Sequence, residues 1–175
     1  METKVYIDDK VGEKWKETAM KRFGYGRGSI SKAAEEALKF WITNEERIEN
    51  TISKLKAVAS KERKIEALLL FGTYARKEIY NDIDVTIVVA KDADKVGIIS
   101  KCSILAPEYP KFDFSIFNDM PINIKSRILS DCKIIYARQG FDMYRLSAGI
   151  IQDLSRIKPM LDAGLVWKCL TRNGS

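Results

Sequence analysis

The stretch of sequence that decides the fold runs over residues 68–90, LLLFGTYARKEIYNDIDVTIVVA. The apolar runs IEALLLF (residues 65–71) and VTIVVA (residues 85–90) predict two strands that are buried on both faces. The polar segment between them begins with Gly72 and Thr73 and ends with Asp82, Ile83 and Asp84. This segment is either a surface hairpin with two solvated acids or a strand edge at which carboxylates hold a cation.

The residue types at the two ends of the polar segment favour a phosphate and metal site. Gly72 allows a close turn, and Thr73 supplies a hydroxyl and a backbone N–H at the start of a short helix, an arrangement that cradles phosphate. If Asp82 and Asp84 begin the next strand, both carboxylates share one face while Ile83 points into the core. Two such acids repel each other unless a divalent cation neutralises them, and Mg²⁺ with nucleotide phosphates suits the pair.

A third acid lies on a later predicted strand. In YPKFDFSIF (residues 109–117), Phe112, Phe114 and Ile116 alternate with Asp113 and Ser115. Alternation along a strand directs Asp113 to the side away from the aromatic core face.

The Gly-Thr turn, the Asp-Ile-Asp triplet and the later aspartate together resemble the nucleotidyltransferase motif of the DNA polymerase β superfamily, especially its minimal stand-alone members. The resemblance covers about residues 46–146, including an ending with a short helix, a strand near residues 133–136 and a closing helix. It implies an α/β (α+β) fold in which helices flank a polymerase-β-like mixed sheet.

The resemblance also implies two-metal catalysis. Asp82 and Asp84 would hold Mg²⁺ against the triphosphate of ATP, the expected nucleotide substrate. Asp113 would complete the metal site and help to deprotonate an attacking hydroxyl. No histidine is needed for this chemistry.

The same resemblance assigns Gly72 and Thr73 to the β and γ phosphates, with Arg76 near them. The chain departs from the family pattern at several positions. Thr73 and Lys77 stand where Ser and Gly are usual, Asn81 stands where Ser often precedes the first Asp, and the loop to the Asp pair is about two residues shorter. Because positioning is most of phosphoryl-transfer catalysis, a domain that keeps the fold without the activity is an alternative.

The first part of the chain predicts a strand, a helix, a Gly-rich turn and a second helix within about forty residues. Lys4–Ile7 alternates polar and apolar side chains, and GYGRGS (residues 24–29) breaks the first helix. The second helix is expected to bury a stripe made of Ala34, Ala37, Leu38 and Trp41. Another helix is expected over residues 44–62. The predicted domains are therefore residues 1–44 and 45–175.

A lone strand in so small a unit is not stable by itself, so a symmetric homodimer is expected in which two copies of the strand pair. The order of elements resembles the ribbon-helix-helix DNA-binding family. The resemblance implies that Lys4 and Tyr6 face the bases of operator DNA, and that the backbone around Ser29 to Ser31 holds a phosphate beside Arg27. A helical hairpin that only dimerises is the alternative.

Composition and charge limit the possible chemistry. The 175 residues include no histidine, which excludes Ser-His-Asp triads, Cys-His pairs and histidine zinc sites. The net charge of +6 divides into +4 over residues 1–64, −3 over residues 65–120 and +5 over residues 121–175. An acidic middle between basic flanks is typical of a cation site beside a polyanion site, and also of an ordinary solvated surface.

The cellular setting is expected to be cytoplasmic. The N-terminus is charged, and no run approaches the 18 or so apolar residues of a membrane span. Cys102, Cys132 and Cys169 are widely spaced and form no ligand motif, so we expect reduced, mostly buried thiols.

The two resemblances together predict an antitoxin-like nucleotidyltransferase. Minimal members of the superfamily often silence a HEPN-type ribonuclease toxin by transferring AMP from ATP to a protein hydroxyl, and many antitoxins repress their own operon. One alternative is a ribbon-helix-helix transcriptional regulator whose nucleotidyltransferase domain is inactive. Another is transfer to a small-molecule acceptor, as in aminoglycoside adenylyltransferases, although the chain has no evident second substrate domain.

Overall fold

A computed structural model describes residues 4–162 of the chain. The elements in chain order are α1 (Asp9–Phe23), α2 (Ser29–Lys61), β1 (Ile65–Phe71), α3 (Gly72–Ala75), β2 (Asp82–Val89), α4 (Lys95–Leu105), β3 (Lys111–Ile116), the 3₁₀ turn η1 (Phe117–Asp119), α5 (Ile122–Asp131), β4 (Lys133–Ala137) and α6 (Met143–Asp162). The chain separates into two compact units, Met1–Arg47 and Ile48–Ser175.

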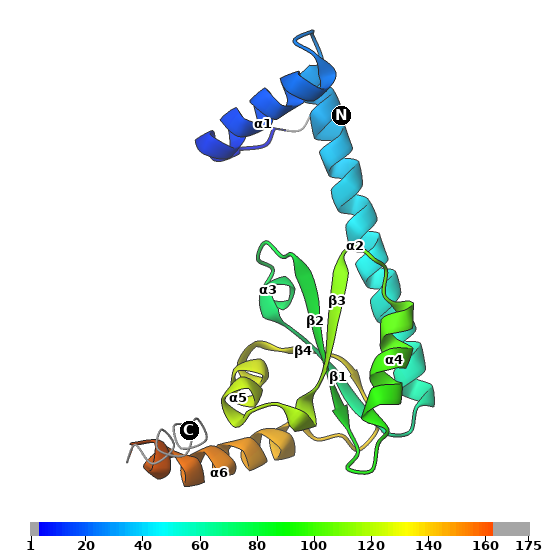
Figure 1. Ribbon diagram of the computed structural model, residues 1–175, viewed down its shortest axis with the longest axis vertical. Coiled ribbons are helices and arrows are strands. Elements are labelled where there is room, and N and C mark those ends of the chain that lie inside the picture. The colour runs from blue at the N-terminus through cyan, green and yellow to red at the C-terminus, as the bar shows by residue number, and fades with distance from the viewer. Residues whose placement is uncertain (1–3, 163–175) are drawn as a thin grey trace, which may run out of the picture. The chain divides into compact units, whose positions relative to one another are not determined.

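A four-stranded mixed sheet forms the centre of the second unit, in the order β3-β2-β1-β4 (Figure 1). β1 pairs antiparallel with both β2 and β4, while β2 and β3 run parallel. The two apolar runs of the sequence are β1 and β2, as predicted, and both are almost wholly buried. The sheet and its helices confirm the predicted mixed α/β fold.

Each face of the sheet has its own core. On one face, Ile83, Val85 and Ile87 of β2 pack with Ile98 of α4 and with Leu55 in the part of α2 that belongs to this unit. On the other face, a second core lies under α5 and α6 (Figure 1) and includes Ala67, Leu69, Val88, Ile128 and Ile150. Because side chains alternate along β2, the even-numbered residues from Asp82 to Val88 share the face that α5 and α6 cover.

The later elements agree with the sequence. β3, α5, β4 and α6 supply the predicted strand, short helix, strand and closing helix. Cys102 is buried and Cys132 is half-buried, and neither forms a disulfide. Cys169 lies outside the described residues. Within residues 4–162, none of the helices combines the length and the apolar character that a membrane crossing requires.

The N-terminal unit contains α1 and the start of α2. Asp8 caps α1 by accepting from the backbone N–H groups of Lys10 and Val11, and Gly24, with φ of +84°, ends the helix. Arg22 of α1 pairs with Glu36 of α2 at 2.6 Å. Residues 4–8 have no regular secondary structure in the single chain. A strand that pairs only with a second copy has no partner in one chain, so the predicted ribbon stays a prediction.

The structure corrects two expectations about α2. First, residues 29–61 form one continuous helix and not two, because no Pro or Gly interrupts them. Second, the stripe that was expected to be buried is largely open in the single chain: Leu38 is 60% exposed and Trp41 is 58% exposed. Burial of this stripe would therefore need another surface.

Candidate active site

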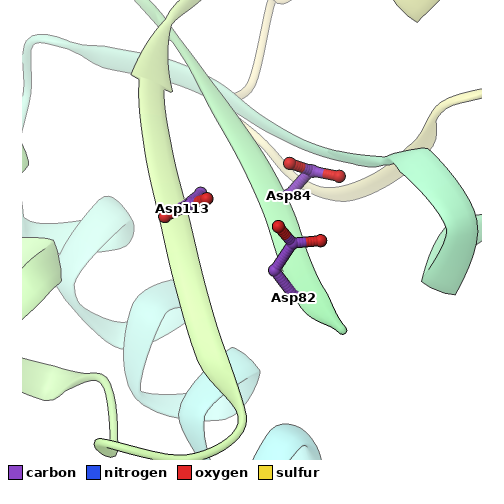
Figure 2. A group of neighbouring side chains, drawn as sticks. All are labelled: Asp82, Asp84 and Asp113. Atoms are coloured by element: carbon purple, nitrogen blue, oxygen red, sulfur yellow. The ribbon is translucent and has the colours of Figure 1, made fainter. Parts of the chain in front are cut away.

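Three carboxylates meet at one edge of the sheet (Figure 2). Asp82 and Asp84 lie on β2, and Asp113 lies on the neighbouring β3, directly opposite Asp84 in the parallel register. One oxygen of each of the three carboxylates lies within 4.8 Å of the others. The predicted metal-ligating residues are thus brought together by the pairing of two strands that lie far apart in the sequence.

Strand alternation explains why the three acids share a face. Ile83, between the two acids of β2, is fully buried in the opposite core, and Phe112, beside Asp113, is 7% exposed. Each buried neighbour fixes its strand, and the pleat then directs the carboxylates to the other face.

The site carries concentrated negative charge. The pKa of Asp84 is raised, first by its burial and then by the negative charges of Asp82 and Asp113. Lys111 pairs with Asp113 at 2.7 Å, and this contact raises the pKa of the lysine. Carboxylate oxygens are the donors that a hard divalent cation prefers. The three half-buried carboxylates of this site therefore fit Mg²⁺.

Gly72 lies against the acids. Its φ is +78°, and a Cβ at this position would come within 2.1 Å of Oδ2 of Asp84. The contact follows from the register, because Phe71, the last residue of β1, is paired with Asp84. Only glycine combines this backbone conformation with so close an approach. The loop is shorter than the family pattern, but it still brings the Gly-Thr turn next to the carboxylates.

The backbone is left-handed at Lys77, one of the positions at which the chain departs from the family pattern. Lys77 has φ of +62°, and it is the one non-glycine residue between 4 and 162 with a positive φ. A left-handed backbone costs a lysine some strain, which the glycine of the family pattern would avoid.

A pocket of about 380 Å³ lies over these residues. It is lined by Phe71, Gly72, Thr73, Arg76, Asp82, Asp84, Ile124, Arg127, Ile128, Ser130 and Asp131. The pocket therefore unites the predicted phosphate turn with two of the predicted metal ligands. Helix α5 forms its other wall.

Arg76, predicted to lie near the phosphates, does line the pocket, but its guanidinium is held by acids. Nε and Nη2 donate to the two oxygens of Glu78 at 3.0 and 2.9 Å, and Nη1 donates to Asp131 at 3.0 Å. These two carboxylates raise the pKa of Arg76 further above its ordinary value. The charge of Arg76 is thus already compensated within the protein.

The α5 wall of the pocket was not predicted from the sequence. This wall is one face of the helix, because its residues are spaced three or four apart along the chain: Ile124, Arg127, Ile128 and Asp131. That spacing was readable in the sequence. The sequence could not show that this face of α5 lies against the same face of the sheet as the three acids.

The predicted DNA-binding residues lie in the other unit, together with the Gly-rich turn. Lys4 and Tyr6 are exposed, and Lys4 Nζ lies 5.2 Å from the centre of the Tyr6 ring, so both side chains point the same way. Arg27 and Ser31 are exposed as well. Ser29 is buried, and its hydroxyl donates to the carbonyls of Gly24 and Gly26 at 2.6 and 3.0 Å.

A larger hollow, of about 600 Å³, lies between the strand–helix connection at residues 138–142 and α6. It contains none of the predicted site residues. The larger hollow is thus not the one with the candidate chemistry. We take the smaller pocket as the candidate active site because the carboxylates converge there.

Comparisons with known proteins agree with the geometry of the site. A family model described as polymerase beta, nucleotidyltransferase, matches residues 53–140. No curated protein sequence matches the chain.

Solved structures share the fold at low sequence identity. A mutant form of the MntA–HpeT toxin–antitoxin complex contains a chain that matches with a TM-score of 0.50 and 18% identity, over 67% of this chain and 97% of that one. A toxin–antitoxin structure with AMP-PNP matches with a TM-score of 0.48 and 18% identity, over 67% and 98%. The complex of tri-AMPylated Shewanella oneidensis HEPN toxin with MNT antitoxin gives a TM-score of 0.46 and 16% identity, over 68% and 98%.

Proposed function

The chain belongs to the polymerase beta nucleotidyltransferase family, and we propose that it is a Mg²⁺-dependent enzyme that transfers AMP from ATP to a hydroxyl group of a partner protein. The observation that carries this proposal is the convergence of three carboxylates beside a glycine turn that approaches one of them closely. Family membership alone would leave the activity open, because a fold can outlast its chemistry.

Asp82, Asp84 and Asp113 would hold the metal, which when bound neutralises triphosphate charge and favours ionisation of the attacking hydroxyl. The hydroxyl oxygen forms a bond to the α-phosphorus, the bond to the bridging oxygen breaks, and pyrophosphate leaves. Asp113, whose side chain is 44% exposed, accepts the hydroxyl proton. Gly72 and Thr73 hold the phosphates through backbone N–H groups and a hydroxyl.

A HEPN-type toxin is the proposed acceptor. The fold shared with a chain of a toxin–antitoxin complex supports this choice, as does the absence of a second substrate domain in the described residues. A protein acceptor supplies its own binding surface, so a small catalytic domain is sufficient.

The N-terminal unit is proposed to dimerise as a ribbon-helix-helix and to bind operator DNA. Lys4 and Tyr6 are exposed, and their side chains lie on the same side of the segment that is proposed to form the ribbon, which supports the proposal. Among the described residues, no backbone carbonyl accepts from the N–H groups of Ile30 and Ser31, although those of Ser29 and Lys32 are bonded. Two free N–H groups at the start of α2 support the proposed phosphate contact.

The transfer is tested with purified protein, α-labelled ATP, MgCl₂ and the protein product of the neighbouring gene. The wild type is expected to label the partner, whereas Asp82→Asn is expected to lower the rate by about 10³-fold or more, as loss of a metal ligand does. Asp153→Asn removes an exposed acid of α6 and serves as the matched control. Binding of ATP without transfer at any Mg²⁺ concentration would favour the alternative, a regulator with an inactive domain.

The DNA proposal is tested with the region upstream of the gene. Lys4→Ala should weaken binding by about 1 kcal/mol or more if the side chain reads bases, whereas Lys10→Ala, on the exposed surface of α1, should change it little. Equal affinities for wild type and Lys4→Ala would remove ribbon recognition from the proposal.

A further inference from the structure

Two guanidinium groups line the pocket over the carboxylates, and they differ in their surroundings. Arg76 makes three hydrogen bonds to Glu78 and Asp131. Arg127, on α5, is exposed, and among the side chains that the structure describes none with a carboxylate pairs with it. One cation of the pocket is therefore compensated and the other is open.

A nucleoside triphosphate brings several negative charges into a pocket that already holds Asp82, Asp84 and Asp131. For Arg76 to bind that ligand, it would have to leave two carboxylates and strand them near the triphosphate. Arg127 would exchange only water for phosphate oxygens, and its planar guanidinium can bind two of them at once.

The position of Arg127 is fixed by the core. The next residue, Ile128, is 2% exposed and belongs to the core under α5 and α6, so the helix cannot turn without losing that packing. One helical turn further on, Asp131 holds Arg76. The same face of α5 thus immobilises one arginine and presents the other.

We propose that Arg127 is the residue that binds the phosphate tail of the nucleoside triphosphate, and that Arg76, held by Glu78 and Asp131, shapes the wall of the pocket. The inference rests on the proposed nucleotidyltransferase function and adds a binding residue outside the Gly-Thr turn and the three acids.

The experiment measures binding of ATP and of AMP by calorimetry to the wild-type chain and to Arg127→Gln, in EDTA and again with MgCl₂. Loss of a charged hydrogen-bonding partner should weaken ATP binding by about 10-fold or more, with a change of only about 2-fold for AMP, which has no β and γ phosphates. Arg127→Lys, which keeps the charge but loses the planar guanidinium, should recover only part of the ATP affinity. Arg145→Gln, the same change at an exposed arginine of α6, should bind both nucleotides as the wild type does.

The outcomes separate the role of Arg127 from the proposed nucleotidyltransferase function. ATP affinity that is unchanged in Arg127→Gln overturns the inference and leaves the proposed function standing, as does an equal loss for ATP and AMP. A wild type that binds no ATP under either condition removes the proposed function and the inference together. If Arg127→Gln does not fold, Arg127→Lys decides: a loss of ATP affinity with a wild-type melting temperature and little change for AMP supports the inference, and ATP affinity equal to that of the wild type opposes it.

Discussion

At the scale of single residues, Gly72 determines how closely the Gly-Thr turn approaches the carboxylate of Asp84. A methyl group at this position would push Oδ2 of Asp84 from its place, and φ of +78° adds strain for any other residue. The carboxylate is a movable end, so the substitution is expected to act on the site more than on the core.

Gly72→Ala is therefore predicted to cost about 1–2 kcal/mol of stability, from the left-handed backbone, and to weaken Mg²⁺ binding because Asp84 must rotate. Gly140→Ala is the matched control: φ is +87° there, but open space surrounds the position of the Cβ. Urea unfolding should show similar losses for both variants, and a Mg²⁺ titration should distinguish them. Equal Mg²⁺ affinities would contradict the close contact.

The raised pKa of Asp84 sets the sign of a pH effect. A carboxyl group whose pKa is raised on folding binds its proton more tightly in the folded state, so its ionisation lowers stability as pH rises through the unfolded and then the folded pKa. In EDTA, Asp84→Asn is therefore predicted to raise the melting temperature at pH 7, and the gain should vanish below the unfolded pKa of about 3.9.

With Mg²⁺ present, the wild type should have the higher melting temperature and Asp84→Asn the lower, the reverse of the order in EDTA. Mg²⁺ is expected to stabilise the wild type by occupying the three carboxylates, and to do so much less in Asp84→Asn. Asp153→Asn, with its exposed side chain, should follow the wild type in both conditions. A melting temperature of Asp84→Asn below that of the wild type in EDTA at pH 7 would show that Asp84 stabilises the fold by some other contact.

At the scale of elements, one arginine joins α2 to the sheet. The guanidinium of Arg138, just after β4, donates to the carbonyls of Ala59 and Glu62 at the end of α2 and of Ile65 in β1, at 2.7–3.0 Å. The last carbonyls of a helix have no partner within it, so Arg138 satisfies the carbonyl of Ala59 and adds a second bond to that of Glu62, which also accepts from the N–H of Ile65 at 3.0 Å.

Arg138→Gln is predicted to lower the free energy of unfolding by about 2–3 kcal/mol, because the shorter amide cannot reach all three carbonyls. Denaturant unfolding measures the loss, and Arg145→Gln is the control for the removed charge. If the two variants are equally stable, the three bonds contribute little.

At the scale of the whole molecule, the exposed apolar side chains of α2 bear on assembly. Leu38, Phe40, Trp41 and Ile42 are between 48% and 60% exposed in the single chain. So much open apolar surface on one helix is typical of an interface, and a second copy would cover it as the proposed dimer requires.

Trp41→Glu is predicted to convert a dimer into a monomer, because it places a charge in the apolar contact. Sedimentation equilibrium gives the mass directly. Tyr144→Glu changes an aromatic residue of α6 that is 89% exposed and should leave the dimer intact. A wild type that is monomeric at high micromolar concentration would remove the homodimer, and with it the paired ribbon.

Most of the fold of the second unit could be predicted from local signals. Burial on both faces marked β1 and β2, and alternation marked Asp113 as facing away from its aromatic neighbours. These signals are local, because side-chain direction along a strand depends only on the pleat. The single long α2 was missed: separate helices were predicted before and after residue 44, but residues 29–61 contain no Pro or Gly to interrupt a helix.

The sequence by itself determined the residue types of the site: a glycine turn, two acids on one strand and one acid on another. Only the tertiary structure decided that β2 and β3 are neighbours, which brings Asp113 opposite Asp84, and that α5 lies over them. The tertiary structure also decided that Arg76 is ion-paired while Arg127 has no carboxylate partner among the described side chains. An ion pair between residues 55 positions apart, such as Arg76 and Asp131, follows from packing and not from sequence spacing. Local periodicity fixes the direction of a side chain, whereas its neighbours are chosen by the burial of the whole core.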